Sequence, residues 1–357
     1  PIFAGAVEAV ASTGGQIMPP VMGASAFLMA QILGIPYWSV AVAAAVPAIL
    51  YYLAVFLMVD LEAARTGLKG LSRSELPNLW KMLGRGYLLA PLVVISYLLA
   101  RGYTPAWAAL SGVLSIAILS MFSRESRLTP RRTIAGLADA GRSATQVATI
   151  AASAGIIIAL LNLSGLGLKF SSALIEMSGG NTMLLLILLM IATLILGMGM
   201  PTIGAYITVV SLIVPTLIMM GIKPLAAHMF AFYFACISAI TPPVALAAYA
   251  AGGLAKANPF KVGFTACRLG LSAFIIPFTF VMSPELLLMG EPLNILLAFL
   301  TASIGVFALS AAAMGYLKRR LNILERILGF VAAIALIFPG ITTDAIGLLF
   351  LGIMLAS

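Results

Sequence analysis

The stretch Ala11-Ser-Thr-Gly-Gly-Gln-Ile-Met-Pro-Pro-Val-Met-Gly23 interrupts an apolar run that is otherwise long enough to cross a membrane as one helix. Gly14 and Gly15 lower helix propensity, and Pro19 and Pro20 each lack a backbone N–H and push the preceding residue out of the helical region. Apolar sequence continues on both sides, so the pattern predicts two half-helices that meet at an unwound segment. In a bilayer, freed backbone groups are tolerated only where protein buries them or water reaches them. A helix broken at membrane depth therefore indicates a binding site.

The same pattern occurs again in Cys236-Ile-Ser-Ala-Ile-Thr-Pro-Pro-Val-Ala-Leu-Ala-Ala-Tyr249. Ile17–Val21 matches Ile240–Val244, and in each copy the next proline lies sixteen residues after the Pro-Pro pair, at Pro36 and Pro259. We interpret the two copies as corresponding positions of two structural repeats, which is the sequence feature that best indicates the site of a secondary transporter. The helix-breaking residues are Pro19, Pro20, Pro242 and Pro243.

The composition defines the class of protein. Of 357 residues, 62% are hydrophobic and only 9% are charged, which is far outside the range of soluble globular proteins. Apolar segments of roughly 17–25 residues, the length that crosses a bilayer, recur along the chain. The sequence therefore predicts an all-α polytopic membrane protein. The net charge of +9 is explained by Lys and Arg in cytoplasmic loops, so no nucleic-acid partner is expected.

The chain divides into four parts by its apolar segments and charged loops. The expected parts are the end of a first transport repeat (1–60), an amphipathic connector and helical pair (61–132), a second transport repeat (133–284) and extra transmembrane helices (285–357). Within the connector, 61–85 mixes basic and apolar residues and is expected to lie at the membrane interface. The last segments, 327–338 and 341–355, form either two short spans or one re-entrant pair.

Residues 133–170 are unusually polar at first and glycine-punctuated at their end, Asn162-Leu-Ser-Gly-Leu-Gly167. This pattern favours a re-entrant helical hairpin over the alternative, an ordinary span closed by a loop. The residues expected at or near its turn are Ser153, Asn162, Ser164, Gly165 and Gly167.

Four segments together are similar to one known family. They are Glu8–Ala24, Leu196-Gly-Met-Gly-Met-Pro201, Thr241–Ala250 and Asn258-Pro-Phe-Lys261. These segments resemble the large membrane subunit of TRAP (tripartite ATP-independent periplasmic) transporters, in particular the fused permeases that pair with TAXI-type binding proteins. The resemblance covers about Pro1 to Leu288.

The resemblance implies a permease of the prokaryotic inner membrane that uses a sodium gradient, in an elevator-like motion, to import an organic anion. The anion would be delivered by a TAXI-type periplasmic substrate-binding protein, and a small four-helix membrane subunit or a fused equivalent would complete the assembly. The implied fold has ion-transporter-type inverted repeats, each with one re-entrant hairpin and one broken helix. Carried over by position, the second hairpin is 148–167 and the breaks are 13–20 and 238–243.

Two features depart from the family's pattern. The family's first hairpin should precede Pro1, and the small subunit is also missing, so we expect an N-terminally truncated fragment. The helices after Glu291 have no counterpart in the common core.

Sodium takes about five or six oxygen ligands, which freed carbonyls and hydroxyls can supply without a fixed charge. The candidate sodium-binding residues are Ser12, Thr13, Gly14, Gly15, Met18, Ser153, Gly165, Ser238, Ala239 and Thr241. A carboxylate substrate would favour neutral donors and helix N-termini. The candidate substrate-binding residues are Gln16, Asn162, Thr202 and Ser164. No cofactor and no metal other than sodium is expected.

Several alternatives remain open from the residues. The hydroxyl groups can simply bond within their own helices. A proton-coupled or binding-protein-independent organic anion transporter would use Glu8, Asp139 or His228, although Asp139 and Arg142 are spaced for an i,i+3 ion pair. An intramembrane enzyme is disfavoured because the chain has a single His and scattered acids, and a passive channel is disfavoured by the repeated breaks. Dicarboxylates, amino acids such as glutamate and other small organic acids all remain candidate substrates.

Overall fold

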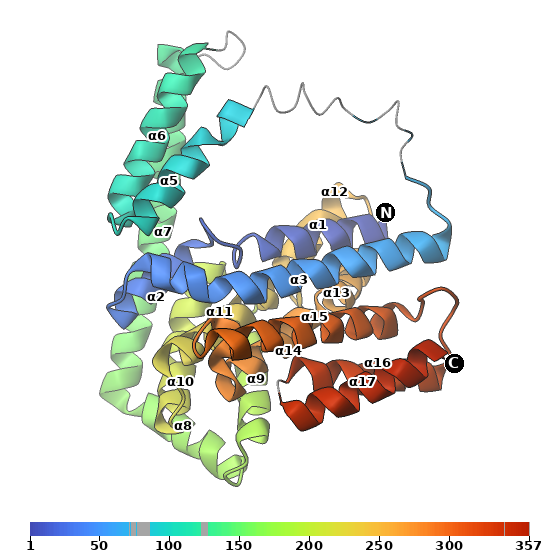
Figure 1. The fold of residues 1–357 in the computed structure, drawn as a ribbon. Helices are drawn as coiled ribbons and strands as arrows, with labels where there is room; N and C mark the ends of the chain where they lie inside the picture. Colours follow the sequence, from blue (N-terminus) through green and yellow to red (C-terminus); the bar gives the residue numbers. More distant parts are fainter. Residues whose placement is uncertain (71, 73–75, 77–85, 123–127, 339, 357) are drawn as a thin grey trace.

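The protein is described here by a computed structural model that covers residues 1–70, 72, 76, 86–122, 128–338 and 340–356. In these residues the secondary structure is helical, without a strand, as predicted (Figure 1). By length and composition, four described helices can cross a membrane, and a fifth span is added if one bent pair counts. The four are α3 (Tyr37–Thr66), α7 (Pro130–Ser164), α10 (Thr202–Met219) and α15 (Pro292–Met314).

Both predicted broken helices are present. The first consists of α1 (Ile2–Gly14) and α2 (Ala24–Leu33), and the second consists of α11 (Pro224–Ile237), the short 3-10 turn η2 (Ser238–Ile240) and α12 (Leu246–Leu254). α1 packs against α12 and α2 packs against α11, so the two broken helices run antiparallel. α1 also contacts η2, which brings the two breaks to the same level of the bundle.

The helices that follow the breaks also correspond. α3 begins after Pro36 and carries Pro47 in its interior, whereas the second repeat continues with α13 (Pro259–Leu269) and α14 (Leu271–Met282). These two helices meet at an angle of 44° around Gly270, which occupies the place of Pro47 when the repeats are aligned on their Pro-Pro pairs. Pro and Gly both weaken a helix interior, but only the second repeat is interrupted at this position, since α3 continues through Pro47.

Charged residues assign opposite orientations to the two repeats. α3 ends with Arg65, and Lys69 follows, so this end faces the cytoplasm by the positive-inside rule. α13 instead begins between Lys256 and Lys261, so its first residues face the cytoplasm. The positive-inside rule therefore predicts that the turn after α2 and the turn after α12 lie on opposite sides of the membrane, which is the arrangement expected for inverted repeats.

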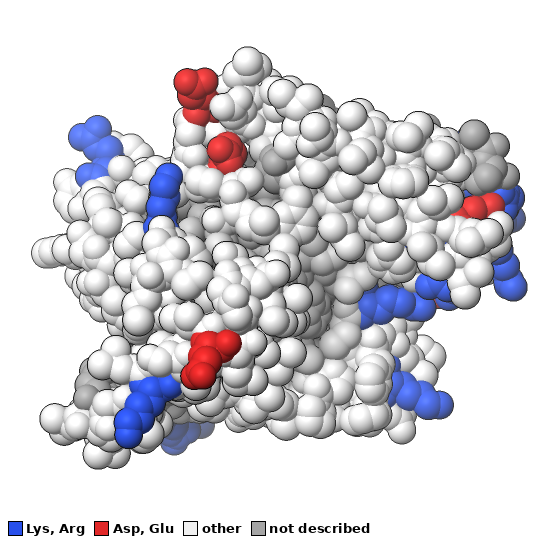
Figure 2. All heavy atoms as spheres, turned by 90° about the horizontal axis from the view of Figure 1, so that it is seen from below, with Lys and Arg blue, Asp and Glu red and all other residues white. Residues whose placement is uncertain are grey.

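The surface agrees with a membrane protein. Figure 2 shows one face of the molecule on which Lys, Arg, Asp and Glu are few and lie mainly toward the edges, separated by broad uncharged areas. Apolar side chains such as Phe56, which is 69% exposed on α3, cover the outward faces of many helices. Such a surface is stable in contact with lipid rather than water.

The predicted hairpin at 148–167 is wrong in its position. α7 is one continuous helix to Ser164, and the chain leaves helical geometry only at Gly165, whose φ is +65°, before α8 (Leu166–Met177) begins. No proline occurs between residues 131 and 164, so nothing removes a backbone donor from the helix. Ser153 therefore lies within α7, about 18 Å along the axis from Gly165, and not at a turn.

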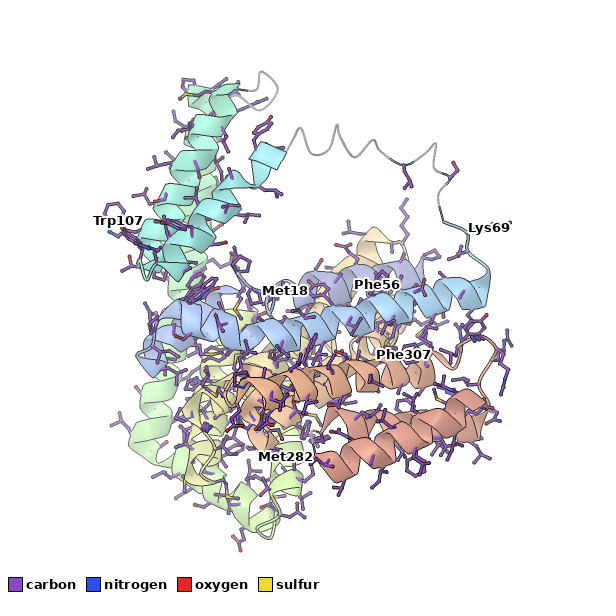
Figure 3. All side chains as sticks on the ribbon, viewed as in Figure 1. Met18, Phe56, Lys69, Trp107, Met282 and Phe307 are labelled. Carbon is purple, nitrogen blue, oxygen red and sulfur yellow. The ribbon has the colours of Figure 1, made fainter. Side chains whose placement is uncertain are left out.

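A helical pair stands beside the body of the molecule, as predicted. It consists of the turn η1 (Gly86–Leu89), α5 (Ala90–Ala100) and α6 (Pro105–Phe122), and Trp107 projects from its outer side (Figure 3). The predicted interfacial segment 61–85 is occupied up to Thr66 by α3, and most of the remainder lies outside the described residues. Two further helices, α8 and α9 (Thr182–Gly197), connect this region to α10.

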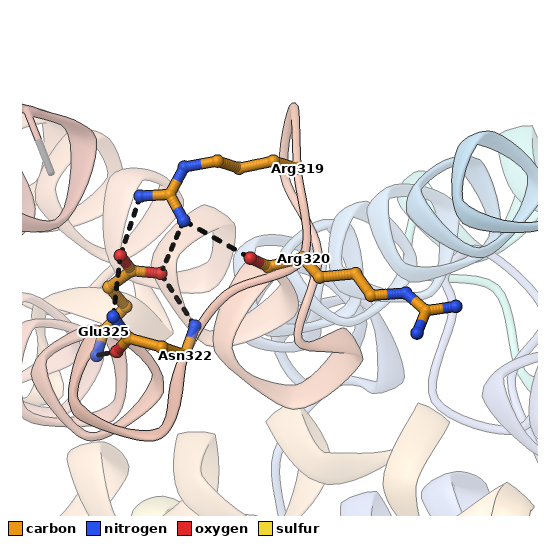
Figure 4. A network of polar contacts seen from close by, with 4 residues as sticks. All are labelled: Arg319, Arg320, Asn322 and Glu325. Carbon is orange, nitrogen blue, oxygen red and sulfur yellow. Dashed lines mark hydrogen bonds and ion pairs between the residues drawn. The ribbon is translucent and has the colours of Figure 1, made fainter.

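The C-terminal part consists of α15, α16 (Ile323–Ile337) and α17 (Ile341–Ala356), with α15 packed along α3. α16 and α17 are two separate helices that lie side by side, an arrangement that both alternatives for this segment share. The turn before α16 is fixed by Arg319, whose Nη2 lies 2.7 Å from Oε1 of the buried Glu325 (Figure 4). Asn322 and Glu325 also form a capping box at the start of α16.

Candidate functional site

The first break is shaped by its two prolines. In a helix the carbonyl of Gln16 would accept from residues 19 or 20, but both are prolines without an N–H. The carbonyl accepts instead from the N–H of Gly23, at 2.7 Å, which turns the chain into the start of α2. Met18 lies in this turn between α1 and α2 (Figure 3).

The second break has the same cause and a different outcome. The carbonyl of Ala239, the residue that corresponds to Gln16, also faces two prolines at the third and fourth following positions, Pro242 and Pro243. Among the described residues, none donates a hydrogen bond to this carbonyl. Leu246 corresponds to Gly23 of the first break, but its N–H does not donate to the carbonyl of Ala239 as the N–H of Gly23 donates to that of Gln16. The Ala239 oxygen is therefore available to a ligand.

Backbone geometry confirms that the breaks are equivalent. The Pro19–Pro20 and Pro242–Pro243 peptide bonds are both cis. Met22 and Ala245, each three residues after the first proline of its pair, have positive φ values of 51° and 28°. Positive φ is uncommon outside glycine, so its recurrence at the same register supports the repeat interpretation independently of the sequence match.

Thr13 presents the clearest candidate ligand of the first break. The residue is only 4% exposed, and its Oγ1 is buried without a hydrogen-bond partner among the described residues. The carbonyls of Gly15 and Met18 also accept no hydrogen bond from any described residue. The carbonyl of Gly14, in contrast, accepts from the N–H groups of Ile17 and Met18. The Thr13 hydroxyl and the carbonyls of Gly15 and Met18 are thus free to bind a cation, whereas the carbonyl of Gly14 already accepts hydrogen bonds.

At the second break both hydroxyls bond to carbonyls of their own segment, as the alternative interpretation predicts, and Ser238 also contacts α9. Thr241 Oγ1 donates to the carbonyl of Ile237 at 2.8 Å, and Ser238 Oγ lies 2.8 Å from the carbonyl of Ala235 and 3.2 Å from that of Gly197. A hydroxyl that donates its proton to a carbonyl keeps its lone pairs. Both oxygens therefore still suit a cation while being held in place by these bonds.

Other predicted ligands lie elsewhere. Ser12 is exposed and donates to the Glu8 carboxylate at 3.0 Å. Ser153 is exposed on α7, and the exposed Ser164 lies 3.2 Å from the carbonyl of Leu161. Gly165 lies at the junction of α7 and α8, with open space where a side chain would stand. The structure therefore does not bring Ser12, Ser153 or Ser164 into one shell with Thr13.

The predicted substrate residues are divided in the same way. Gln16 is half-buried and its side chain lies against Gly23 in the first break. Thr202 is the first residue of α10, whose early turn meets Ile150 of α7 at Gly204. The end of α7, which carries Asn162 and Ser164, lies about 18–21 Å further along that helix from Ile150.

The segment between α9 and α10 adjoins the second break, which was not predicted. A Cβ at Gly197 would stand 2.7 Å from Ser238 Oγ, and one at Gly199 would stand 3.5 Å from Val244. Gly199 has a φ of +75°, which favours glycine. The glycines of Leu196–Pro201 were visible in the sequence, but their contact with Ser238 and Val244 depends on packing. The N-terminus of α10 is therefore held next to the second break.

The acids and the histidine form local contacts. Asp139 and Arg142 make an exposed ion pair at 3.4 Å, as their spacing predicts. His228 is buried, and its Nδ1 lies 2.7 Å from the hydroxyl oxygen of Tyr206. Neither break segment, 13–23 or 236–246, contains an acidic residue or a histidine.

Two broken helices of opposite orientation, with oxygen-rich breaks at one level of an apolar bundle, define a membrane protein of the secondary-transporter class. The profile of the family "Tripartite ATP-independent periplasmic transporter, DctM component" matches residues 1–295. The chain belongs to this family, which confirms the TRAP resemblance of its motifs. A comparison with curated proteins finds no match. The family implies a multi-pass permease that works with a substrate-binding protein and a small membrane subunit.

Proposed function

We propose that this chain is the permease subunit of a sodium-coupled, binding-protein-dependent importer of small organic acids in the prokaryotic inner membrane. The observation that carries the sodium assignment is the buried Thr13 hydroxyl, which has no partner among the described residues. A buried polar group without a partner costs about 1–3 kcal/mol, which a bound cation would restore. The open carbonyls of Gly15 and Met18 supply further neutral oxygens in the same turn.

Sodium is favoured over a proton by the chemistry of the breaks. A proton-coupled site is usually built on an acidic residue or a histidine, and neither break segment contains one. Hydroxyl and carbonyl oxygens suit a hard cation instead. The second break offers the Ala239 carbonyl together with Ser238 and Thr241, so each repeat provides a set of oxygens of its own.

A carboxylate substrate is supported by neutral donors and by a helix N-terminus. The first backbone N–H groups of α10 have no partner within the helix and attract an anion. Thr202 stands at this end, and Gln16 offers an amide at the first break. Asn162 and Ser164 could act as donors only if the C-terminal end of α7 came closer to the N-terminus of α10.

The test is uptake of labelled organic acids into proteoliposomes that contain the complete transporter, with and without a TAXI-type binding protein, under a sodium or a proton gradient. Dicarboxylates and glutamate are the first substrates to compare. We expect uptake to require both the binding protein and inward sodium. Uptake driven by protons alone would refute sodium coupling, and uptake without the binding protein would refute the proposed partnership.

A further inference from the structure

Three hydroxyl groups from one helix bond to the carbonyls that flank the first break. On the α1 side, Tyr51 donates to the carbonyl of Val10 at 2.7 Å and Tyr52 donates to the carbonyl of Ala11 at 2.8 Å. These carbonyls lie near the C-terminal end of α1, and that of Ala11 also accepts from the N–H of Gly15 at 3.3 Å. Both tyrosines lie on α3, forty-one residues away in sequence from the groups they bond.

On the other side of the break, Tyr37 of α3 performs the same role. Its hydroxyl lies 2.8 Å from the carbonyl of Pro20 and 2.9 Å from that of Val21. Its ring also stacks on Phe27 of α2, with a centroid distance of 4.0 Å. α3 therefore bonds to the chain both before and after the unwound turn and fixes the distance between the two half-helices.

The approach of the tyrosines depends on Gly14. A Cβ at this position would stand 2.4 Å from Cε1 of Tyr51 and 2.9 Å from Cζ of Tyr52. Since real Cβ contacts are not this short, only glycine lets both rings pass the end of α1. Gly14 thus serves the packing of the tyrosines and not only the flexibility of the break.

The second repeat lacks all three hydroxyl groups. When the repeats are aligned on their Pro-Pro pairs, Tyr37, Tyr51 and Tyr52 correspond to Phe260, Phe274 and Ile275.

The carbonyls of the second break are bonded from closer in the chain. Tyr249 of α12 donates to the carbonyl of Pro243, and Cys267 of α13 makes a long contact of 3.5 Å with that of Ile240. The two breaks share their backbone geometry but not the means by which it is held.

We propose that Tyr37, Tyr51 and Tyr52 are positioning residues that hold the first break in its cation-binding geometry, a role that the residues at the corresponding positions of the second repeat cannot perform. They do so through the carbonyls of Val10, Ala11, Pro20 and Val21, which keeps the Thr13 hydroxyl and the neighbouring carbonyls oriented toward one point. The cation-binding part of this inference rests on the proposed sodium coupling.

The test uses Tyr51→Phe and Tyr52→Phe, which remove one hydroxyl each and keep the ring. Amide hydrogen exchange of the complete transporter in detergent is measured over residues 10–23 and 236–246, together with the sodium dependence of uptake. A lost hydroxyl–carbonyl bond is expected to speed exchange about 2- to 10-fold in the first segment only and to raise the half-saturating sodium concentration by a similar factor. Tyr97→Phe, on the exposed face of α5, is the matched control.

The two readouts separate the possible failures. If wild-type uptake is independent of sodium, the proposed coupling fails, while the exchange data still test the tyrosines. If wild-type uptake depends on sodium but both variants keep its half-saturating concentration, the positioning role is refuted. Exchange that rises equally in both segments would also refute it, because it would indicate a general loss of packing. Tyr249→Phe is expected to show the reverse pattern, with faster exchange only in 236–246.

Discussion

Replacing Gly14 by alanine should damage the first break although alanine is the better helix former. Gly14 ends α1 with a buried backbone, and helix propensity alone would favour the substitution by up to about 1 kcal/mol. The new Cβ would stand 2.4 Å from Cε1 of Tyr51, against an ordinary contact of about 3.5–4 Å between carbon atoms. The Tyr51 ring must therefore move by about 1 Å or more.

That movement breaks the 2.7 Å bond from Tyr51 to Val10 and leaves the buried Tyr51 hydroxyl without its acceptor. Overpacking costs about 1–3 kcal/mol and the lost bond about 1 kcal/mol. After the gain in helix propensity is subtracted, we expect Gly14→Ala to lower the free energy of unfolding by about 1–3 kcal/mol. Reversible unfolding of the purified protein in mixed detergent micelles measures this difference.

Gly15→Ala is the matched control. Gly15 is the next residue, has a helical φ of −59° and would place a Cβ only against the carbonyl of Ser12, at 3.2 Å. The free energy of unfolding of Gly15→Ala should stay within about 0.5 kcal/mol of wild type, because substitutions at exposed sites usually have effects no larger than this. If Gly14→Ala is as stable as Gly15→Ala, the contact between Gly14 and Tyr51 does not constrain the break and the reasoning fails.

Three further substitutions test the cation site and the C-terminal helices. Thr13→Val keeps the shape of the side chain and removes its free hydroxyl, so half-saturating sodium for uptake should rise about tenfold. Thr265→Val, at a partly exposed site on α13, should change it less than about twofold. Glu325→Gln removes the buried charge that Arg319 binds and should cost about 1–3 kcal/mol in detergent unfolding; an unchanged value would show that the ion pair adds nothing. Gly305→Leu should cost about 1–3 kcal/mol by the same assay, because a Cβ there would stand 2.8 Å from Ile337 of α16, and a neutral result would contradict the close α15–α16 packing.

The sequence alone determined the membrane class, the two broken helices and their register. These follow from local chemistry: proline removes a donor from its own backbone wherever it stands, and an apolar segment of sufficient length enters a bilayer whatever its neighbours are. The Pro-Pro pairs therefore located the breaks at Pro19 and Pro242 before any contact was known. The two prolines that follow Ala239 removed its helical donors, but the same holds for Gln16, whose carbonyl accepts from Gly23, so only the structure showed which carbonyl stays open.

The hairpin prediction failed for a related reason. Polar and glycine residues lower the preference for a helix but do not forbid one, and no proline interrupts α7 between residues 131 and 164. Ser153 was therefore wrongly included among the turn residues, whereas the chain turns at the predicted Gly165, which has a positive φ. Gly165 was correctly predicted at the turn, but the length of the helix before it was not.

Only the tertiary structure decided which oxygens face inward and what holds them there. Ser12 and Thr13 are neighbours of similar chemistry, yet Ser12 is exposed beside Glu8 and Thr13 is buried without a partner. The direction of a side chain depends on which face of α1 packs against the rest of the bundle, and the break itself leaves that open. The hydroxyls of Tyr51 and Tyr52 reach α1 across forty-one residues, a distance over which sequence spacing carries no information about contact. Proline acts through bonds of its own backbone and can be predicted from sequence, whereas these hydrogen bonds exist only because packing brings α1 and α3 together.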